Sequence, residues 1–158
     1  MTCEFCELAN AVRLYEDDSI VVAIRDHVFT PGQITVLPKE HITILDAVPK
    51  DVMEKIALAV NKVSIAAFEG MGSQGTNVLI QNGLAGGQKR PHFSVDIIPR
   101  QENDTVQLDW TPNPLAEDEL ARIAERIKEG LNPQEEVSEV KEVEGKENYL
   151  LKQLDRMP

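Results

Sequence analysis

The chain has 158 residues, enough for one domain with a sizeable core, whereas two domains would be cramped. Its formal net charge of −11 argues against a general nucleic-acid binder, because phosphate backbones are held by basic surfaces. It does not exclude a small phosphorylated ligand, which needs only a local cluster of donors. No apolar run approaches the roughly 20 residues of a membrane span. The first ten residues lack the basic start of a signal peptide, so a cytoplasmic protein is expected.

The first half of the chain predicts two strands and a long helix. Residues 19–24 are a β-branched run typical of a strand, and Pro31-Gly32 marks a turn. Residues 34–38 form a second strand ended by a proline, so the two strands are expected to pair as a hairpin. A helix is predicted over residues 50–69, where apolar side chains recur at steps of three and four: Val52, Ile56, Ala59, Val60, Val63 and Ala67.

The second half predicts two more strands and a second helix. Strands are expected over residues 77–81 and 93–98, separated by the glycine-rich loop NGLAGGQ at residues 82–88. A helix is expected over residues 115–131, with Leu120, Ile123, Ala124 and Ile127 on one stripe. Residues 133–148 are charged and poor in core-forming residues. We therefore expect a domain over residues 1–131, followed by a charged linker and C-terminal tail over residues 132–158.

This order of elements predicts an α+β fold. Strands joined by short links, with helices between them, favour an antiparallel sheet of about five strands whose one face is covered by the two helices.

Four side chains have the chemistry of a zinc site. The spacing of Cys3 and Cys6 as C-x-x-C favours metal binding or redox chemistry over a structural disulfide. Adding His41 and His92 would complete a tetrahedral Cys2His2 set, which suggests a structural ion because no ligand position stays open. The alternative from spacing alone is that both histidines are ordinary surface or core residues.

A polar face follows the glycine-rich loop. Strand alternation places His92, Ser94 and Asp96 on one face and the apolar Phe93, Val95 and Ile97 on the other. The backbone N–H groups of the loop could cradle a phosphate, although most such loops only turn the chain.

Together these motifs resemble the histidine-triad (HIT) family, of the Hint/Fhit-like archaeal or bacterial type. The family signature is a glycine-rich loop ending in Gln, then His-φ-His-φ-His-φ-φ, often followed by Pro-Arg, where φ is apolar. Residues 82–100 resemble it, as NGLAGGQ and then HFSVDIIPR. Other family features occur in order: the C-x-x-C, Tyr15-Glu16-Asp17, Asp26 before Pro31-Gly32, and Val36-Leu37-Pro38-Lys39-x-His41. The resemblance covers about residues 2–130.

The resemblance implies specific site residues. Zinc-containing members hold the ion with the residues matching Cys3, Cys6, His41 and His92. Asp26 matches the acid that bonds the ribose hydroxyls. Asn82, Gly87 and Gln88 match the loop near the phosphate. Lys89-Arg90 departs from the family, which has a small hydroxyl residue and an apolar residue there; these cations could restore attraction for a phosphate or could be solvated surface residues. The family binds nucleotides and commonly forms a homodimer.

The departures from the signature concern catalysis, because the triad is degenerate, His-x-Ser-x-Asp. In the family the middle histidine attacks the α-phosphate, and here Ser94 stands at that position. A serine hydroxyl needs an adjacent base to act as a nucleophile. The third histidine, a donor toward the phosphate, is replaced by Asp96, whose ionised form cannot donate. His27 is the one histidine outside the zinc set, and a solvent-facing loop residue is its plainer interpretation.

Three hypotheses follow. The first is a zinc-containing HIT protein that binds a nucleotide or other phosphorylated ligand without the family's nucleotidyl-histidine chemistry. The second is an active nucleotide hydrolase or nucleotidyl transferase with rearranged catalytic residues. The third is a zinc-stabilised interaction scaffold.

Overall fold

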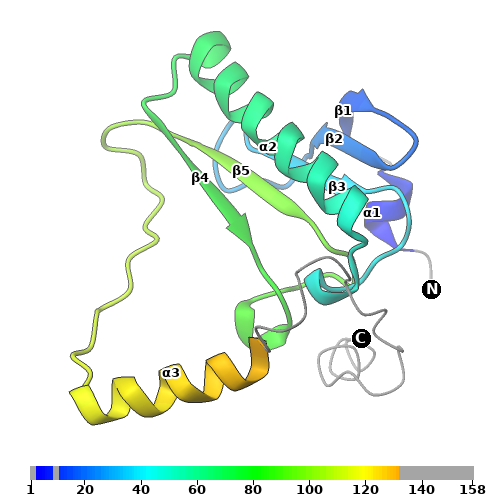
Figure 1. Ribbon diagram of the computed structural model, residues 1–158. Helices are drawn as coiled ribbons and strands as arrows, with labels where there is room; N and C mark the ends of the chain where they lie inside the picture. Colours follow the sequence, from blue (N-terminus) through cyan, green and yellow to red (C-terminus); the bar gives the residue numbers. More distant parts are fainter. Residues whose placement is uncertain (1–2, 9–10, 132–158) are drawn as a thin grey trace. The chain divides into compact units, whose positions relative to one another are not determined.

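A five-stranded antiparallel sheet forms the centre of the fold in the computed structural model (Figure 1), which describes residues 3–8 and 11–131. The predicted linker and tail lie outside the described residues. The strand order is β1-β2-β3-β5-β4. The α+β prediction is confirmed. The strand bounds are β1 Val12–Glu16, β2 Ile20–Ile24, β3 Ile34–Pro38, β4 Gly75–Ile80 and β5 Val95–Arg100.

Helix α2 (Lys50–Met71) lies across one face of this sheet (Figure 1). Its apolar stripe packs on the sheet, and Ile56 and Ala67 are buried there. The helix ends at Gly72, which adopts a left-handed conformation with φ 64° and donates its N–H to the carbonyl of Phe68. The prediction of a helix over residues 50–69 is confirmed.

Different elements cover the two faces of the sheet. Successive side chains of strand β2 therefore point alternately into two separate cores. Ile20 and Val22 pack with the α2 side, whereas Val21 and Ala23 pack with Phe5 and its neighbours. Phe5 belongs to α1 (Glu4–Glu7), one turn of helix within the C-x-x-C segment. The cysteines are therefore brought to the sheet face opposite α2.

Besides α1, three short elements were not predicted from the sequence. Strand β1 has no buried residue, so it shows no alternation between a core face and a solvent face. The helices η1 (Leu45–Ala47) and η2 (Leu84–Gly86) are single 3-10 turns. Strand β5 begins at Val95 and not at Phe93. The backbone N–H of Phe93 instead donates to the carbonyl of Ile42 at 2.6 Å, which ties this segment to the chain after β3.

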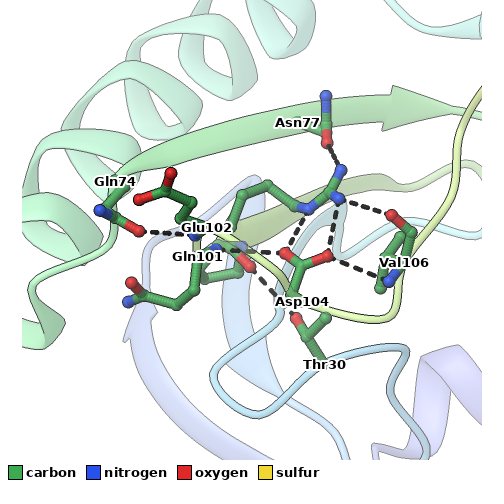
Figure 2. Close-up of polar contacts among 9 residues, drawn as sticks. Thr30, Gln74, Asn77, Gln101, Glu102, Asp104 and Val106 are labelled. Carbon is green, nitrogen blue, oxygen red and sulfur yellow. Dashed lines mark hydrogen bonds and ion pairs between the residues drawn. The ribbon is translucent and has the colours of Figure 1, made fainter.

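The turn after β5 is held by an arginine (Figure 2). The Arg100 guanidinium donates to both carboxylate oxygens of Asp104, at 2.6 and 2.7 Å, and to the side-chain oxygen of Asn77 on β4. The same carboxylate accepts the backbone N–H groups of Gln101 and Val106. Arg100 holds the pKa of Asp104 well below its usual range. These bonds close the turn against the sheet.

Residues 107–131 belong to a second compact unit. Within it α3 (Glu117–Leu131) confirms the predicted second helix, with its first two predicted residues outside the helix. Its apolar stripe of Leu120, Ile123, Ile127 and Leu131 is exposed. Among the described residues, no helix has the length and apolar character needed to cross a membrane.

Candidate metal centre and ligand pocket

Four ligand atoms converge where α1 meets the sheet. The side chains of Cys3, Cys6, His41 and His92 each offer one atom, and these atoms all lie within 4.8 Å of one another. The Cys6 sulfur is 3.3 Å from Nδ1 of His41 and 3.5 Å from Nδ1 of His92, and the Cys3 sulfur is 3.5 Å from the latter atom. In a zinc tetrahedron, bonds of roughly 2.3 Å to sulfur and 2.05 Å to nitrogen give S···N edges of about 3.6 Å. The four residues therefore fit a zinc ion.

His92 is the most constrained of these four residues. It is buried, and its Nε2 lies 3.0 Å from the carbonyl oxygen of Pro38. A proton on Nε2 makes that bond and leaves the Nδ1 lone pair facing the thiols, as a ligating histidine requires. Burial lowers the pKa of His92, with a smaller contribution from His41, so the imidazole is favoured in its neutral, metal-binding form.

The cysteines owe their position to the turn of helix between them. The carbonyl of Cys3 accepts the backbone N–H groups of Cys6 and Glu7, and this turn places both thiols beside the imidazoles of His41 and His92. Desolvation of the thiol and the neighbouring Cys3 side chain raise the pKa of Cys6 to about 11. A divalent cation between the thiols would offset both effects, because it stabilises the thiolate.

A pocket of about 660 Å³ opens beside this cluster. It brings together five residues predicted for the site, Asp26, Gln88, Lys89, Ser94 and Asp96, with the metal-cluster residue His92. Phe93, Val95 and Ile97 point instead into the core under α2, as strand alternation predicts. The rest of the lining comes from the 25–33 loop, from α1 and from residues that flank the glycine-rich loop: Phe5, Arg25, His27, Val28, Phe29, Gln33, Gln81 and Arg90.

Gln88 braces the glycine-rich loop from within. Its side-chain oxygen accepts the N–H of Gly83 at 2.8 Å, and its nitrogen donates to the carbonyls of Thr43 and Arg90. Gly87 allows the chain to turn there, with φ 85°. The amide of Gln88 is thus engaged with the protein, and the residue shapes the pocket through the backbone that it holds.

Asn82 lies at the start of the same loop and outside the pocket lining. Its oxygen accepts the N–H of Leu45, and its nitrogen donates to the carboxylate of Asp46, both in η1. Asn82 therefore connects the loop to the segment after His41. A direct role for Asn82 at a phosphate stays a prediction.

The two pocket carboxylates have different partners. Asp96 accepts a hydrogen bond from the hydroxyl of Thr35, on the neighbouring strand β3, at 2.6 Å. Asp26 lies 3.0 Å from Nδ1 of His27, and this contact lowers the pKa of Asp26. The side chain of His27 is 83% exposed, in agreement with its interpretation as a loop residue at the rim.

Cations outnumber carboxylates in the pocket, although the chain as a whole is acidic. Arg25, Lys89 and Arg90 line it against Asp26 and Asp96. Lys89 and Asp26 were predicted from the sequence, whereas Arg25 and Phe5 were not. No local pattern marks those two positions, because Phe5 lies in α1 and Arg25 follows β2, and the packed fold brings them together.

Comparison with known proteins decides the family. The HIT domain model matches residues 8–103, which is more than half of the chain. The chain belongs to the HIT family. It is 32% identical over 108 residues to the adenylylsulfatase HINT3 of Arabidopsis thaliana, an alignment that covers 66% of this chain and 55% of that protein. It is 30% identical over 106 residues to an uncharacterised HIT-like protein of Methanocaldococcus jannaschii, covering 65% of this chain and 81% of that protein.

Solved HIT structures resemble this fold closely. A HIT family protein from Bacillus subtilis superposes with a TM-score of 0.75 at 26% identity, covering 82% of this chain and 96% of the other. A zinc-bound histidine triad family protein from Mycobacterium smegmatis superposes with a TM-score of 0.63 at 27% identity, covering 80% and 98%. The HIT fold is therefore confirmed, and a related protein contains zinc.

Proposed function

We propose that this HIT protein holds a structural zinc ion and binds a nucleotide or similar phosphorylated ligand without forming a nucleotidyl-histidine intermediate. The observation that carries this proposal is a serine in the pocket where the family signature has its middle histidine. Ser94 lines the pocket between His92 and Asp96. A hydroxyl is a weak nucleophile without a base in contact, and no hydrogen bond joins Ser94 to a histidine among the described residues.

The zinc ion would be held by Cys3, Cys6, His41 and His92. The ion would act as a structural cross-link, because four protein ligands leave no open coordination position for water or substrate. The convergence of the four donor atoms within 4.8 Å and the zinc-bound relative from M. smegmatis both support this assignment. The ion would tie the start of the chain to the segments carrying residues 41 and 92.

Different pocket residues are suited to different parts of the proposed ligand. Asp26 is an acceptor suited to ribose hydroxyls, and its low pKa keeps it ionised at neutral pH. Lys89 and Arg25 supply positive charge for a phosphate, which offsets repulsion from Asp96. Phe29, which is 59% exposed, gives a surface on which a base can stack. An adenine nucleotide is the first candidate, since the Arabidopsis relative is named for adenylyl sulfate.

A ligand screen with paired turnover assays tests this function. Thermal shifts would be measured with AMP, GMP, adenylyl sulfate and dinucleoside polyphosphates, and hydrolysis with nucleoside phosphoramidates. We expect stabilisation by at least one nucleotide and no turnover at family-like rates. Lys89→Gln should weaken binding several-fold, whereas Lys50→Gln, at the start of α2 and outside the pocket, should not. No shift with any nucleotide would favour the scaffold hypothesis instead.

One observation favours an enzyme as the second candidate. The contact of 3.0 Å between Asp26 and Nδ1 of His27 orients this imidazole, and both residues line the pocket that contains Ser94. A base held in this way could activate the Ser94 hydroxyl if the rim closed over a ligand. Turnover that is lost in both Ser94→Ala and His27→Gln would establish this function and overturn the first.

We also propose a homodimer formed along strand β4. Among residues 3–8 and 11–131 this strand pairs only with β5, and none of them pairs with its other edge. Val78 and Ile80 point to the face that carries α2 and are 49% and 41% exposed. Phe68 adds exposed apolar surface on α2 itself. A second copy that extends the sheet would cover this surface.

A further inference from the structure

The turn of helix between the two cysteines is also a wall of the ligand pocket. Phe5, at the centre of the C-x-x-C segment, lines the pocket and is 4% exposed. Its ring contacts the ring of His92 edge to face, with centroids 5.9 Å apart. The guanidinium of Arg25 lies over the same ring, 4.3 Å from its centroid. One pocket cation is therefore positioned by a residue that sits between two metal ligands.

A second contact connects the same helix to the opposite wall. The carboxylate of Glu4 lies 2.6 Å from the guanidinium of Arg90, which follows the glycine-rich loop and also lines the pocket. Glu4 immediately follows Cys3 and Arg90 is two residues before His92, so both partners neighbour metal ligands in the sequence. Two of the three pocket cations thus depend on α1 for their placement.

Helix α1 cannot hold this position through its own hydrogen bonds. It has four residues, far below the length at which an isolated helix is stable in water. Its anchors to the sheet are the buried side chains of Phe5 and Leu8 and the two cysteine sulfurs that face His41 and His92. An ion bound to those sulfurs would fix both ends of the turn, whereas without one only the apolar anchors remain.

We propose that occupancy of the metal centre sets the affinity of the pocket for anionic ligands, through Glu4 and Phe5. This inference rests on the proposed function. The ion fixes α1, α1 orders Arg25 and Arg90, and these cations receive the charge of the ligand. Because linkage is reciprocal, a bound anion strengthens metal binding by the same factor. Glu4 and Phe5 are positioning residues in this scheme, since they act on the ligand through the two arginines.

Calorimetric titration of AMP and of pyrophosphate into zinc-loaded and chelator-stripped protein tests this coupling. Circular dichroism would establish that the stripped protein keeps its fold. We expect dissociation constants at least tenfold higher for the stripped protein. Saturating AMP should lower the dissociation constant for zinc by the same factor, measured by competition with a chromogenic chelator.

Variants separate coupling from stability. In Glu4→Gln/Phe5→Leu, which retains all four metal ligands, the ratio of stripped to loaded dissociation constants should fall toward one. In Glu54→Gln, an exposed residue of α2 outside the pocket, the ratio should be unchanged. If the stripped protein unfolds, the test is made on the zinc-loaded double variant. Its affinity for AMP should then be at least fivefold lower than that of the zinc-loaded wild-type protein.

The possible results are distinct. Equal affinity of folded stripped and loaded protein, or an unchanged affinity of the loaded double variant, would overturn the coupling and leave the proposed function intact. Absence of binding by every form would refute the proposed function itself.

Discussion

His92 contributes to both candidate sites. Its Nδ1 faces the two thiols, its Nε2 contacts the carbonyl of Pro38, and its ring edge touches Phe5. It also lines the pocket beside Ser94. A buried imidazole with both nitrogens engaged is not available as a general base, so the residue next to the proposed ligand site is a structural histidine. Catalytic competence would therefore have to come from elsewhere in the pocket.

Zinc content should distinguish the metal-cluster residues from His27. We expect His41→Gln and Cys3→Ser to lose bound zinc and to unfold at lower temperature, because removing one of four ligands opens the coordination shell. The side chain of His27 is exposed at the pocket rim, so His27→Gln serves as the matched control and should keep one equivalent of zinc per chain. Elemental analysis and thermal unfolding are the measurements. A native wild-type protein without zinc would contradict the assignment.

Residue identity was easier to predict than residue contacts. The sequence pattern supplied Cys3, Cys6, His41 and His92 as a set, and their side chains do converge. It could not show that the side-chain amide of Gln88 would be satisfied by backbone groups of Gly83, Thr43 and Arg90. The contacts of Phe5 with Arg25 and His92 join parts of the chain that lie far apart in sequence. Such pairings depend on the packed fold and leave no periodic signal.

Among the elements, those with a buried face were predictable and those without one were not. The helix over residues 50–69 and the strands near residues 20, 34 and 95 all pack one or both faces in a core, so apolar spacing revealed them. Strand β4, which was also predicted, is partly buried at four of its six residues. Strand β1 is exposed along its whole length and was not predicted. Helix α1 has four residues, about one turn, which is too short for an amphipathic pattern to repeat. Its importance follows from its cysteines and not from its helicity.

The glycine-rich loop offers a matched pair of substitutions. Gly87 has φ 85°, and an added Cβ would lie 2.6 Å from the side-chain nitrogen of Gln81, a pocket residue. Gly86 has open space around an added Cβ. We expect Gly87→Ala to lower the free energy of unfolding by about 1 kcal/mol because of the left-handed backbone. Gly86→Ala should change it little. Denaturant unfolding measures both, and equal effects would contradict the assigned strain.

The turn after β5 should give stability that depends on pH. Arg100 depresses the pKa of Asp104 in the folded protein, so the ionised carboxylate stabilises the fold at neutral pH. That contribution is full above the unfolded-state pKa of about 3.9 and is lost as pH falls toward the depressed value. Asp104→Asn should therefore lower the unfolding temperature at pH 7, with a difference that narrows below about pH 4. Asp109→Asn, an exposed control, should show no such trend.

The whole molecule combines an acidic surface with a local excess of cations. The net charge of −11 keeps long polyanions away, while three pocket cations face two carboxylates. Small anions can reach such a pocket because their charge interacts mainly within about 8–10 Å at physiological salt. This distribution of charge suits a nucleotide better than a nucleic acid.

Assembly can be tested with one substitution at each edge of the sheet. Val78→Lys places a charge on the exposed edge of β4 and should convert the proposed dimer to a monomer in sedimentation velocity experiments. Val12→Lys, on the opposite edge strand β1, is the matched control and should leave the sedimentation coefficient unchanged. A monomeric wild-type protein, or dissociation by both substitutions, would contradict an interface along β4.

The order in which the ribosome makes the chain adds a last consequence. Cys3 is separated from His92 by 89 residues, yet their side chains lie 3.5 Å apart in the finished protein. At a synthesis rate of roughly 5–20 residues per second, His92 is made on the order of ten seconds after the two cysteines. During that interval they are free to meet oxidants or other thiols. If the proposed zinc ion is bound, cells that keep their nascent chains reduced should therefore yield more zinc-loaded protein than cells under oxidative stress.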